Sequence, residues 1–119
     1  MERKDILQRK WDFIAKYAQY WDVPLMSNEQ LQVLLPRAQK GDAEAEDTIA
    51  RSMMRFVVSV AKHYLDKGLS DEELVEAGKK GLVIAIPKYD RSHGFRFISY
   101  AVWFVRNSIL QAIEDKFKS

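Results

Sequence analysis

The chain has no cysteine among its 119 residues and no long apolar run. Without cysteine, a disulfide framework and a thiolate metal site are both excluded. A membrane-spanning helix needs about 18 or more consecutive apolar residues, which the sequence does not offer. The charged start Met1-Glu-Arg-Lys-Asp5 also lacks the apolar stretch of a signal peptide. We therefore expect a cytoplasmic protein with no membrane partner.

Catalytic and metal-binding patterns are also missing from the sequence. The two histidines, His63 and His93, have no second ligand at metal spacing and are expected to be structural or exposed. The segment Gly78-Lys-Lys-Gly81 lies inside a helical pattern, whereas a phosphate-binding loop follows a strand. No serine has the context of an activated nucleophile. We expect no enzyme activity, no cofactor and no metal.

The charges are unevenly distributed although the formal net charge is only +2. Residues 86–113 carry four lysines and arginines against one acid, and residues 48–67 have the same four-to-one balance. The acids gather instead in residues 42–47 and 71–73. Helix starts favour acids through the helix dipole, and the same clustering predicts a basic surface on a nearly neutral chain. The length predicts one domain, residues 1–119.

Helical periodicity without strand signals predicts an all-α fold, a compact bundle of about five helices. The first helix is expected over residues 3–20. Capping boxes at Ser27 and Ser70 predict helix starts there, and Asp42 is expected to cap a long helix that reaches residue 67. Pro36 is expected to shorten or kink the second helix. The apolar side predicted for the first helix consists of Leu7, Trp11, Ile14, Ala15 and Ala18.

Two glycines lie in the middle of the helix that begins after Ser70. Gly78 and Gly81 each cost a helix about 1 kcal/mol relative to alanine. Their presence therefore predicts a close approach of another helix at that point.

The last predicted helix, within residues 94–113, has two apolar faces. One is a core stripe, and the other is an aromatic stripe on the opposite side. The core stripe consists of Ile98, Ala101, Val102, Val105, Ile109, Ala112 and Ile113. The second stripe consists of Tyr100, Trp103, Phe104, Asn107 and Gln111.

Three interpretations of the aromatic stripe are open on the residues alone. The helix is buried on all sides, or the stripe is a protein interface, or its rings stack on unpaired bases. Arg96 and Arg106 flank the stripe and could hold backbone phosphates. Arginines interleaved with aromatics suit single strands better than duplex grooves, where the bases are hidden.

Four collinear motifs resemble the bacterial RNA polymerase sigma factors of the housekeeping class. Residues 94–109 look like the promoter-melting segment, and residues 73–90 look like the polymerase-docking helix. Residues 55–69 resemble the core helix of that family, and residues 24–42 resemble the segment that precedes it. The resemblance divides the chain into a loosely matched N-terminal helix (1–22), a preceding segment (23–47) and the docking and melting helices (48–119).

The resemblance implies a domain that binds core RNA polymerase through a coiled coil on the largest catalytic subunit. It also implies recognition of the minus-ten promoter element and capture of flipped bases on the non-template single strand. Tyr100 would stack on the flipped adenine in a pocket with Phe95 and Phe97, and Trp103 and Phe104 would form the paired-aromatic wedge. The other implied DNA contacts are Arg96, Arg106, Asn107 and Leu110. The implied polymerase contacts are Glu73, Glu76, Ala77, Lys79, Lys80 and Val83.

Several residues depart from the pattern of the family. Phe104 replaces a tryptophan in the wedge, Asn107 a glutamine and Leu110 a threonine, so we expect the base-reading edge to differ. Met53 replaces an asparagine near the DNA. Ala77 and Lys79 replace a glutamate and an asparagine in the docking helix. These last two changes predict altered polymerase affinity or an altered partner.

Domains for the extended promoter and the minus-thirty-five element are expected in a full member of the family and have no counterpart in this sequence. The chain is then either an excised part or a short natural relative that works with a recruiting protein or an anti-sigma protein, or competes for polymerase. The alternative function is an adaptor or decoy that binds polymerase without melting DNA. A duplex-reading helix-turn-helix module is the third possibility.

Overall fold

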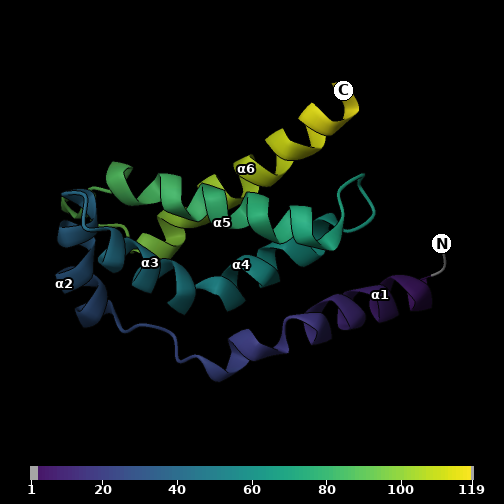
Figure 1. Ribbon diagram of the computed structural model, residues 1–119, viewed down its shortest axis with the longest axis horizontal. Helices are drawn as coiled ribbons and strands as arrows, with labels where there is room; N and C mark the ends of the chain where they lie inside the picture. The colour runs from purple at the N-terminus through teal and green to yellow at the C-terminus, as the bar shows by residue number, and fades with distance from the viewer. Residues whose placement is uncertain (1–2, 119) are drawn as a thin grey trace.

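The structure is a computed structural model that describes residues 3–118, with only the backbone described for Arg3, Lys4 and His93. The described part is entirely helical in its regular structure, which confirms the all-α prediction (Figure 1). Six α-helices and three 3-10 turns lie along it, close to the expected five helices. They are α1 (Arg3–Lys16), η1 (Ala18–Asp22), α2 (Asn28–Gln39), α3 (Ala43–Ser52), α4 (Met54–Ala61), η2 (Lys62–Tyr64), α5 (Asp71–Lys88), η3 (Arg91–His93) and α6 (Phe97–Lys118).

The predicted helix starts are confirmed at three positions. Ser27 and Ser70 form complete capping boxes with Gln30 and Glu73, and Asp42 accepts hydrogen bonds from two backbone N–H groups at the start of α3. Pro36 lies inside α2 without ending it, since the helix continues to Gln39.

The prediction of one continuous helix over residues 42–67 is wrong in one respect. It is divided at Met53, which leaves the helical region and connects α3 to α4. Met53 itself is buried, so both halves keep their apolar residues in one core and the hydrophobic pattern gives no sign of the break.

The apolar side predicted for α1 is also wrong. Trp11 is 66% exposed and Leu7 is exposed, whereas Phe13 and Tyr17 are the buried residues of this segment. Arg9 and Lys16 flank the buried pair and are neutralised by acids at the start of α5: Arg9 Nη2 lies 2.6 Å from Asp71 Oδ1. In the sequence, a stripe that mixes cations with aromatics does not indicate a core face. The acids that neutralise these cations lie about 60 residues further along the chain, so the local pattern of α1 does not reveal the pairing.

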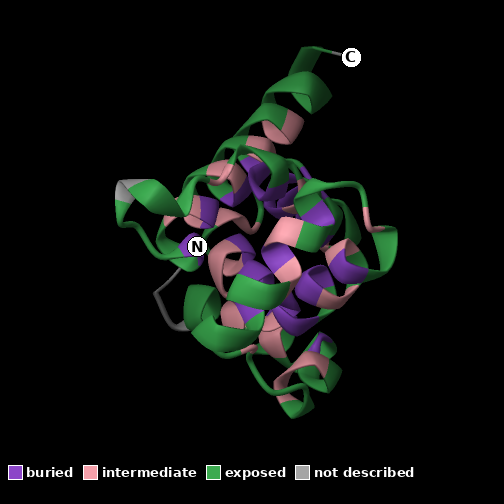
Figure 2. Ribbon diagram, turned by 90° about the vertical axis from the view of Figure 1, so that its left-hand side faces the viewer, coloured by how far each residue is buried: buried purple, intermediate pink, exposed green. Residues whose placement is uncertain are grey.

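The centre of the fold is the packing of α5 against α6, with α4 beneath them (Figure 1). Leu82 and Ile86 from α5 and Val105 and Ile109 from α6 are fully buried. Figure 2 shows that burial is concentrated between the helices and that the C-terminal end of α6 is exposed. Each such aliphatic side chain contributes about 1.5–3 kcal/mol when it leaves water.

The predicted close approach at the two glycines is confirmed. A Cβ atom added at Gly81 would lie 2.2 Å from the carbonyl oxygen of Phe104, which is backbone and cannot rotate away. A Cβ atom at Gly78 would lie 2.7 Å from Cγ1 of Val57, which is the end of a side chain. Gly81 therefore sets how closely the backbones of α5 and α6 approach.

We expect Gly81→Ala to lower the free energy of unfolding by at least about 2 kcal/mol, because overpacking against a backbone carbonyl forces the two helices apart. Chemical denaturation followed by circular dichroism measures this change. Gly78→Ala is the matched control in the same helix, and its effect should be smaller because Val57 can move. Equal stability of Gly81→Ala and the unmodified chain would contradict the close approach.

Candidate functional site

Two surfaces on the α5–α6 pair carry the residues singled out from the sequence. We call Phe95, Tyr100, Trp103 and Phe104 the aromatic face. We call the hollow between α5 and the C-terminal half of α6 the docking groove. It is lined by Leu69, Glu73, Glu76, Ala77, Lys79, Lys80, Val83, Ile84, Ala112, Asp115 and Lys116.

The aromatic face is partly exposed, so the interpretation that α6 is buried on all sides is wrong. Trp103 and Phe95 are each 60% exposed. Tyr100 and Phe104 are half-buried. In the core stripe, Val105 and Ile109 are buried as predicted, whereas Ile98 is exposed.

The half-buried rings form a row that the sequence did not predict. The Tyr100 ring lies between Tyr89, at a centroid distance of 5.6 Å, and Phe104, at 5.0 Å. Tyr89 also meets Phe97 edge to face at 5.3 Å. The Tyr100 hydroxyl donates a hydrogen bond of 3.2 Å to the carbonyl oxygen of Lys88. One face of each ring is therefore held by its neighbours.

Tyr89 is the residue that sequence reasoning missed. It follows Lys88, at the point where α5 ends, and its ring connects the core residue Phe97 to the row. The signal available was an aromatic residue directly after the Pro87-Lys88 end of an amphipathic helix, where the chain turns back toward the same core.

Cations lie against two rings of the aromatic face. The Arg106 guanidinium carbon is 5.7 Å from the Trp103 ring centroid, and Lys88 Nζ is 5.7 Å from that of Phe104. Such cation–π contacts hold long side chains beside the rings. The aromatic face thus presents flat apolar surfaces next to positive charges.

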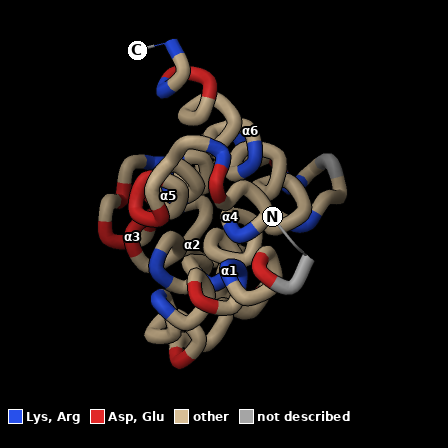
Figure 3. Tube along the Cα trace, turned by 90° about the vertical axis from the view of Figure 1, so that its right-hand side faces the viewer, with Lys and Arg blue, Asp and Glu red and all other residues tan. Residues whose placement is uncertain are grey.

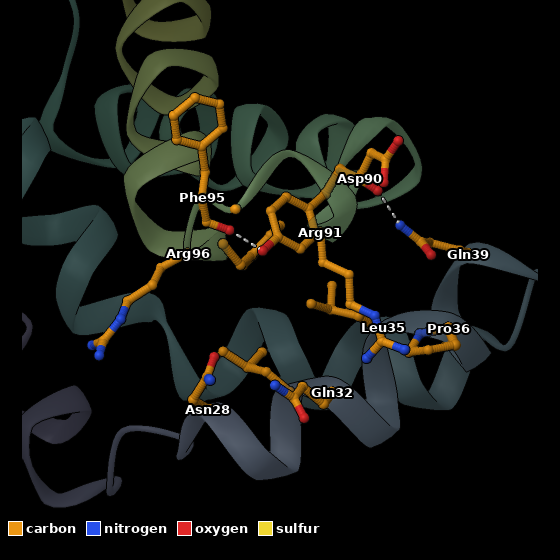
Figure 4. Close-up of a pocket in the computed structure, with 13 residues that line it drawn as sticks. Asn28, Gln32, Leu35, Pro36, Gln39, Asp90, Arg91, Phe95 and Arg96 are labelled. Carbon is orange, nitrogen blue, oxygen red and sulfur yellow. Dashed lines mark hydrogen bonds between the residues drawn. The ribbon is translucent and has the colours of Figure 1, made fainter.

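A hollow of about 510 Å³ separates α2 from the segment before α6 (Figure 4). Phe95, Arg96 and Phe97 line it, but Tyr100 is not among its residues. Phe97 is 2% exposed and belongs to the core, so it can support a bound group only from below. In Figure 4 the Phe95 ring points away from α2 and Arg96 extends outward.

Hydrogen bonds from side chains to backbone carbonyl oxygens fix the segment that forms this hollow. Gln39 Nε2 donates to the carbonyl oxygens of Ile86, at 3.0 Å, and Tyr89, at 2.7 Å. The Tyr89 hydroxyl donates to the carbonyl oxygen of Phe95. Gly94 has φ +79°, a left-handed conformation that glycine adopts without strain. The chain therefore turns into α6 along a defined path.

The two residues of the predicted base-reading edge lie in different hollows. Asn107 lines one with Phe104 and Gln111, against Lys80 and Ile84 of α5. Leu110 lines another with His63, Tyr64 and Phe117. Asn107 and Leu110 are both exposed, but the structure does not bring them together.

All six residues predicted to bind a partner line the docking groove, whose volume is about 690 Å³. Ala77 is buried and Val83 half-buried at its base, while Glu76 and Lys80 are exposed. The apolar base and charged rim have the anatomy of a protein interface.

Glu73 is less available than its neighbours in the groove. Its carboxylate accepts a hydrogen bond from the Ser70 backbone N–H at 2.9 Å and pairs with Lys116 at 3.1 Å. The Ser70 N–H, followed by Lys116, lowers the pKa of Glu73 below its usual range. Glu73 thus fixes the start of α5 and ties it to the end of α6.

The described residues contain no group of three or more metal-ligating side chains. None of the helices in residues 3–118 combines the length and apolar character that crossing a membrane requires. His63 is exposed, which agrees with the prediction of a structural or exposed histidine, whereas the side chain of His93 lies outside the described residues.

Comparison with known proteins decides the family. The Sigma-70 region 2 family matches residues 49–117, which extend from α3 to the end of α6. The chain belongs to the sigma-70 region 2 family. RNA polymerase sigma factor SigA from a Bacillus species is 39% identical over 94 residues, which are 79% of this chain and 25% of SigA. SigA from Clostridium acetobutylicum has the same identity and the same coverage of both chains.

The match extends beyond the SigA proteins. RNA polymerase sigma factor RpoS from Coxiella burnetii is 37% identical over 93 residues, which are 78% of this chain and 26% of RpoS. The chain therefore spans about a quarter of the length of these curated relatives. Because sigma factors are initiation factors without catalytic activity, the prediction that this sigma-70 region 2 chain is not an enzyme is confirmed.

Proposed function

We propose that this chain is the polymerase-binding and promoter-melting part of a transcription initiation factor in the bacterial cytoplasm. In this proposal the docking groove binds core RNA polymerase, through a coiled coil of its largest catalytic subunit. The aromatic face holds unpaired non-template bases of the minus-ten element. The observation that carries the proposal is the exposed Trp103 with Arg106 against its ring, on the helix that the family match covers.

The chemistry of the aromatic face supports binding of a single strand. Stacking of a base on an aromatic side chain contributes about 1–3 kcal/mol, and unstacking a base from the duplex costs a few kcal/mol. Two exposed rings with adjacent arginines, Phe95 with Arg96 and Trp103 with Arg106, can offset that cost. Tyr100 contributes one ring edge, since its other contacts are already made within the chain.

The other predicted DNA contacts lie on two different sides of α6. Phe104 belongs to the half-buried row, and Asn107 lies beside it on the α5 side, where it can meet the edge of the melted segment. Leu110 faces the opposite hollow and offers an apolar contact only. The shortened Asn107 leads us to expect weaker base discrimination at that edge than a glutamine would give.

A second candidate function is a polymerase-binding adaptor or decoy that does not melt DNA. The internal packing of Tyr100, with its hydroxyl on the Lys88 carbonyl, favours this alternative because it occupies part of the stacking surface. A recruiting protein or an anti-sigma protein could then bind the same domain. Polymerase binding without any single-strand binding would identify the adaptor.

Binding to a fluorescent single-stranded minus-ten oligonucleotide tests the role of the aromatic face. We expect Trp103→Ala to weaken binding roughly 5–150-fold, which corresponds to the loss of about 1–3 kcal/mol of stacking. Tyr100→Phe should bind like the unmodified chain because the ring is kept. Fluorescence anisotropy measures both.

The control for this experiment is Trp11→Ala, which removes a similarly exposed tryptophan from α1. It should leave single-strand binding unchanged. If Trp103→Ala and Trp11→Ala bind equally well, the aromatic face does not hold bases.

A charge-swapped variant tests the docking groove. Glu76→Lys combined with Lys80→Glu keeps the net charge but reverses the rim, and we expect it to weaken binding to core polymerase roughly tenfold, or about 1.4 kcal/mol. Surface-immobilised core polymerase provides the measurement. Lys40→Glu, at the end of α2, is the control, and an affinity of the swapped variant equal to that of the unmodified chain would show that the groove is not the docking surface.

A further inference from the structure

The end of α5 carries backbone carbonyl oxygens that other helices satisfy. The last four carbonyl groups of an α-helix have no N–H partner within that helix. We call residues 86–89, where α5 ends, the α5 corner. Gln39 of α2 donates hydrogen bonds to two carbonyl oxygens of this corner, and the Tyr100 hydroxyl of α6 donates to a third, that of Lys88. The α5 corner therefore joins α2 to α6.

Tyr89 extends this corner to the aromatic face. Its hydroxyl donates a hydrogen bond to the carbonyl oxygen of Phe95, which carries one of the exposed rings. Its own ring is half-buried against the core and lies beside the ring of Tyr100. The corner thus holds the backbone at Phe95 and the ring at Tyr100, which lie on either side of the start of α6.

Phe95 depends on this hydrogen bond because it precedes α6. The first hydrogen bond of that helix joins the Tyr100 N–H to the carbonyl oxygen of Arg96, so the helix does not hold the carbonyl group of Phe95. The Phe95 ring is 60% exposed and points away from α2 (Figure 4). A base that stacks on a mobile group must first order it, and that ordering weakens binding. A fixed Phe95 backbone removes part of this cost.

We propose that Gln39 and Tyr89 are positioning residues that pre-organise the aromatic face for unpaired bases. This inference rests on the proposed function of that face. Tyr89 acts through Phe95 and Tyr100, and Gln39 acts through the carbonyl oxygens of the α5 corner. Gln39 precedes residues 49–117, which match the family. The segment that precedes the family match thus takes part in shaping the DNA-binding surface.

Tyr89→Phe removes the hydroxyl and keeps the ring, so it tests the hydrogen bond alone. We expect it to weaken binding of the single-stranded minus-ten oligonucleotide roughly two- to tenfold, because Phe95 must then be ordered on binding. Gln39→Ala should weaken binding by a similar factor. Fluorescence anisotropy measures both. Tyr20→Phe and Gln8→Ala make the same chemical changes in η1 and α1, and they should bind like the unmodified chain.

Combined variants distinguish a positioning role of Tyr89 from a general effect on the fold. If the hydroxyl acts through Phe95, Tyr89→Phe should cause no further loss of binding in a chain that already carries Phe95→Ala. It should cause its full loss in a chain that carries Trp103→Ala, because independent sites have additive effects. Equal losses in the two backgrounds would overturn the proposal. Unchanged binding by Tyr89→Phe alone would also overturn it.

A measurement without DNA separates this inference from the proposed function. The NMR order parameters of the Phe95 and Arg96 amides should fall from about 0.85, the rigid range, toward about 0.6 in Tyr89→Phe. They should stay unchanged in Tyr20→Phe. If Tyr89→Phe leaves them unchanged, the α5 corner does not fix this segment and the positioning proposal alone fails. If the unmodified chain binds no single strand, the proposed function fails, and the role of the corner in base binding fails with it.

Discussion

The contact between Gly81 and the backbone of Phe104 is the constraint on which the two surfaces depend. No side chain separates α5 from α6 at this point, so the carbonyl of Phe104 rests directly on the glycine. The approach fixes the rotation of α6 and therefore the direction of every side chain along it. Val105 and Ile109 enter the core, while Trp103 is left exposed. The same approach brings Ala112 of α6 beside Ala77 of α5 in the docking groove.

This arrangement places the proposed polymerase surface directly beside the proposed DNA surface. The hollow that contains Asn107 and Phe104 also contains Ala77, Lys80 and Ala112, which line the docking groove as well. A partner seated in the groove therefore lies next to the edge of the aromatic face. The acidic residues of α3 and α5 lie together on one flank of the molecule, as Figure 3 shows.

The sequence predicted the features that have local causes. The helix starts at Ser27, Asp42 and Ser70 follow from side chains that bond to backbone groups two or three residues away. The close approach at Gly78 and Gly81 was predictable because glycines in a helix centre need a packing reason. The six predicted partner-binding residues lie within three turns of one helix and share a side of it, so they line one groove. The resemblance to sigma factors named them, and the structure brings them together.

The features that sequence reasoning missed depend on residues distant in the chain. The buried face of α1 depends on Asp71 and Glu72, which neutralise Arg9 and Lys16 across more than 50 residues. The break at Met53 leaves the apolar pattern unchanged and so gave no signal. In the candidate site, Tyr89 joins the aromatic row from another helix, and Asn107 and Leu110 separate because α5 lies against one and η2 lies near the other. None of these relations can be read from spacing along one helix.

The central claim is that this small helical domain opens DNA when it is bound to polymerase. The most direct measurement places 2-aminopurine at the adenine expected to flip in a duplex minus-ten element and follows its fluorescence. The account predicts a rise when core polymerase and this chain are both present, and no rise with polymerase alone. Formation of the complex on the duplex without any rise in fluorescence would contradict the account.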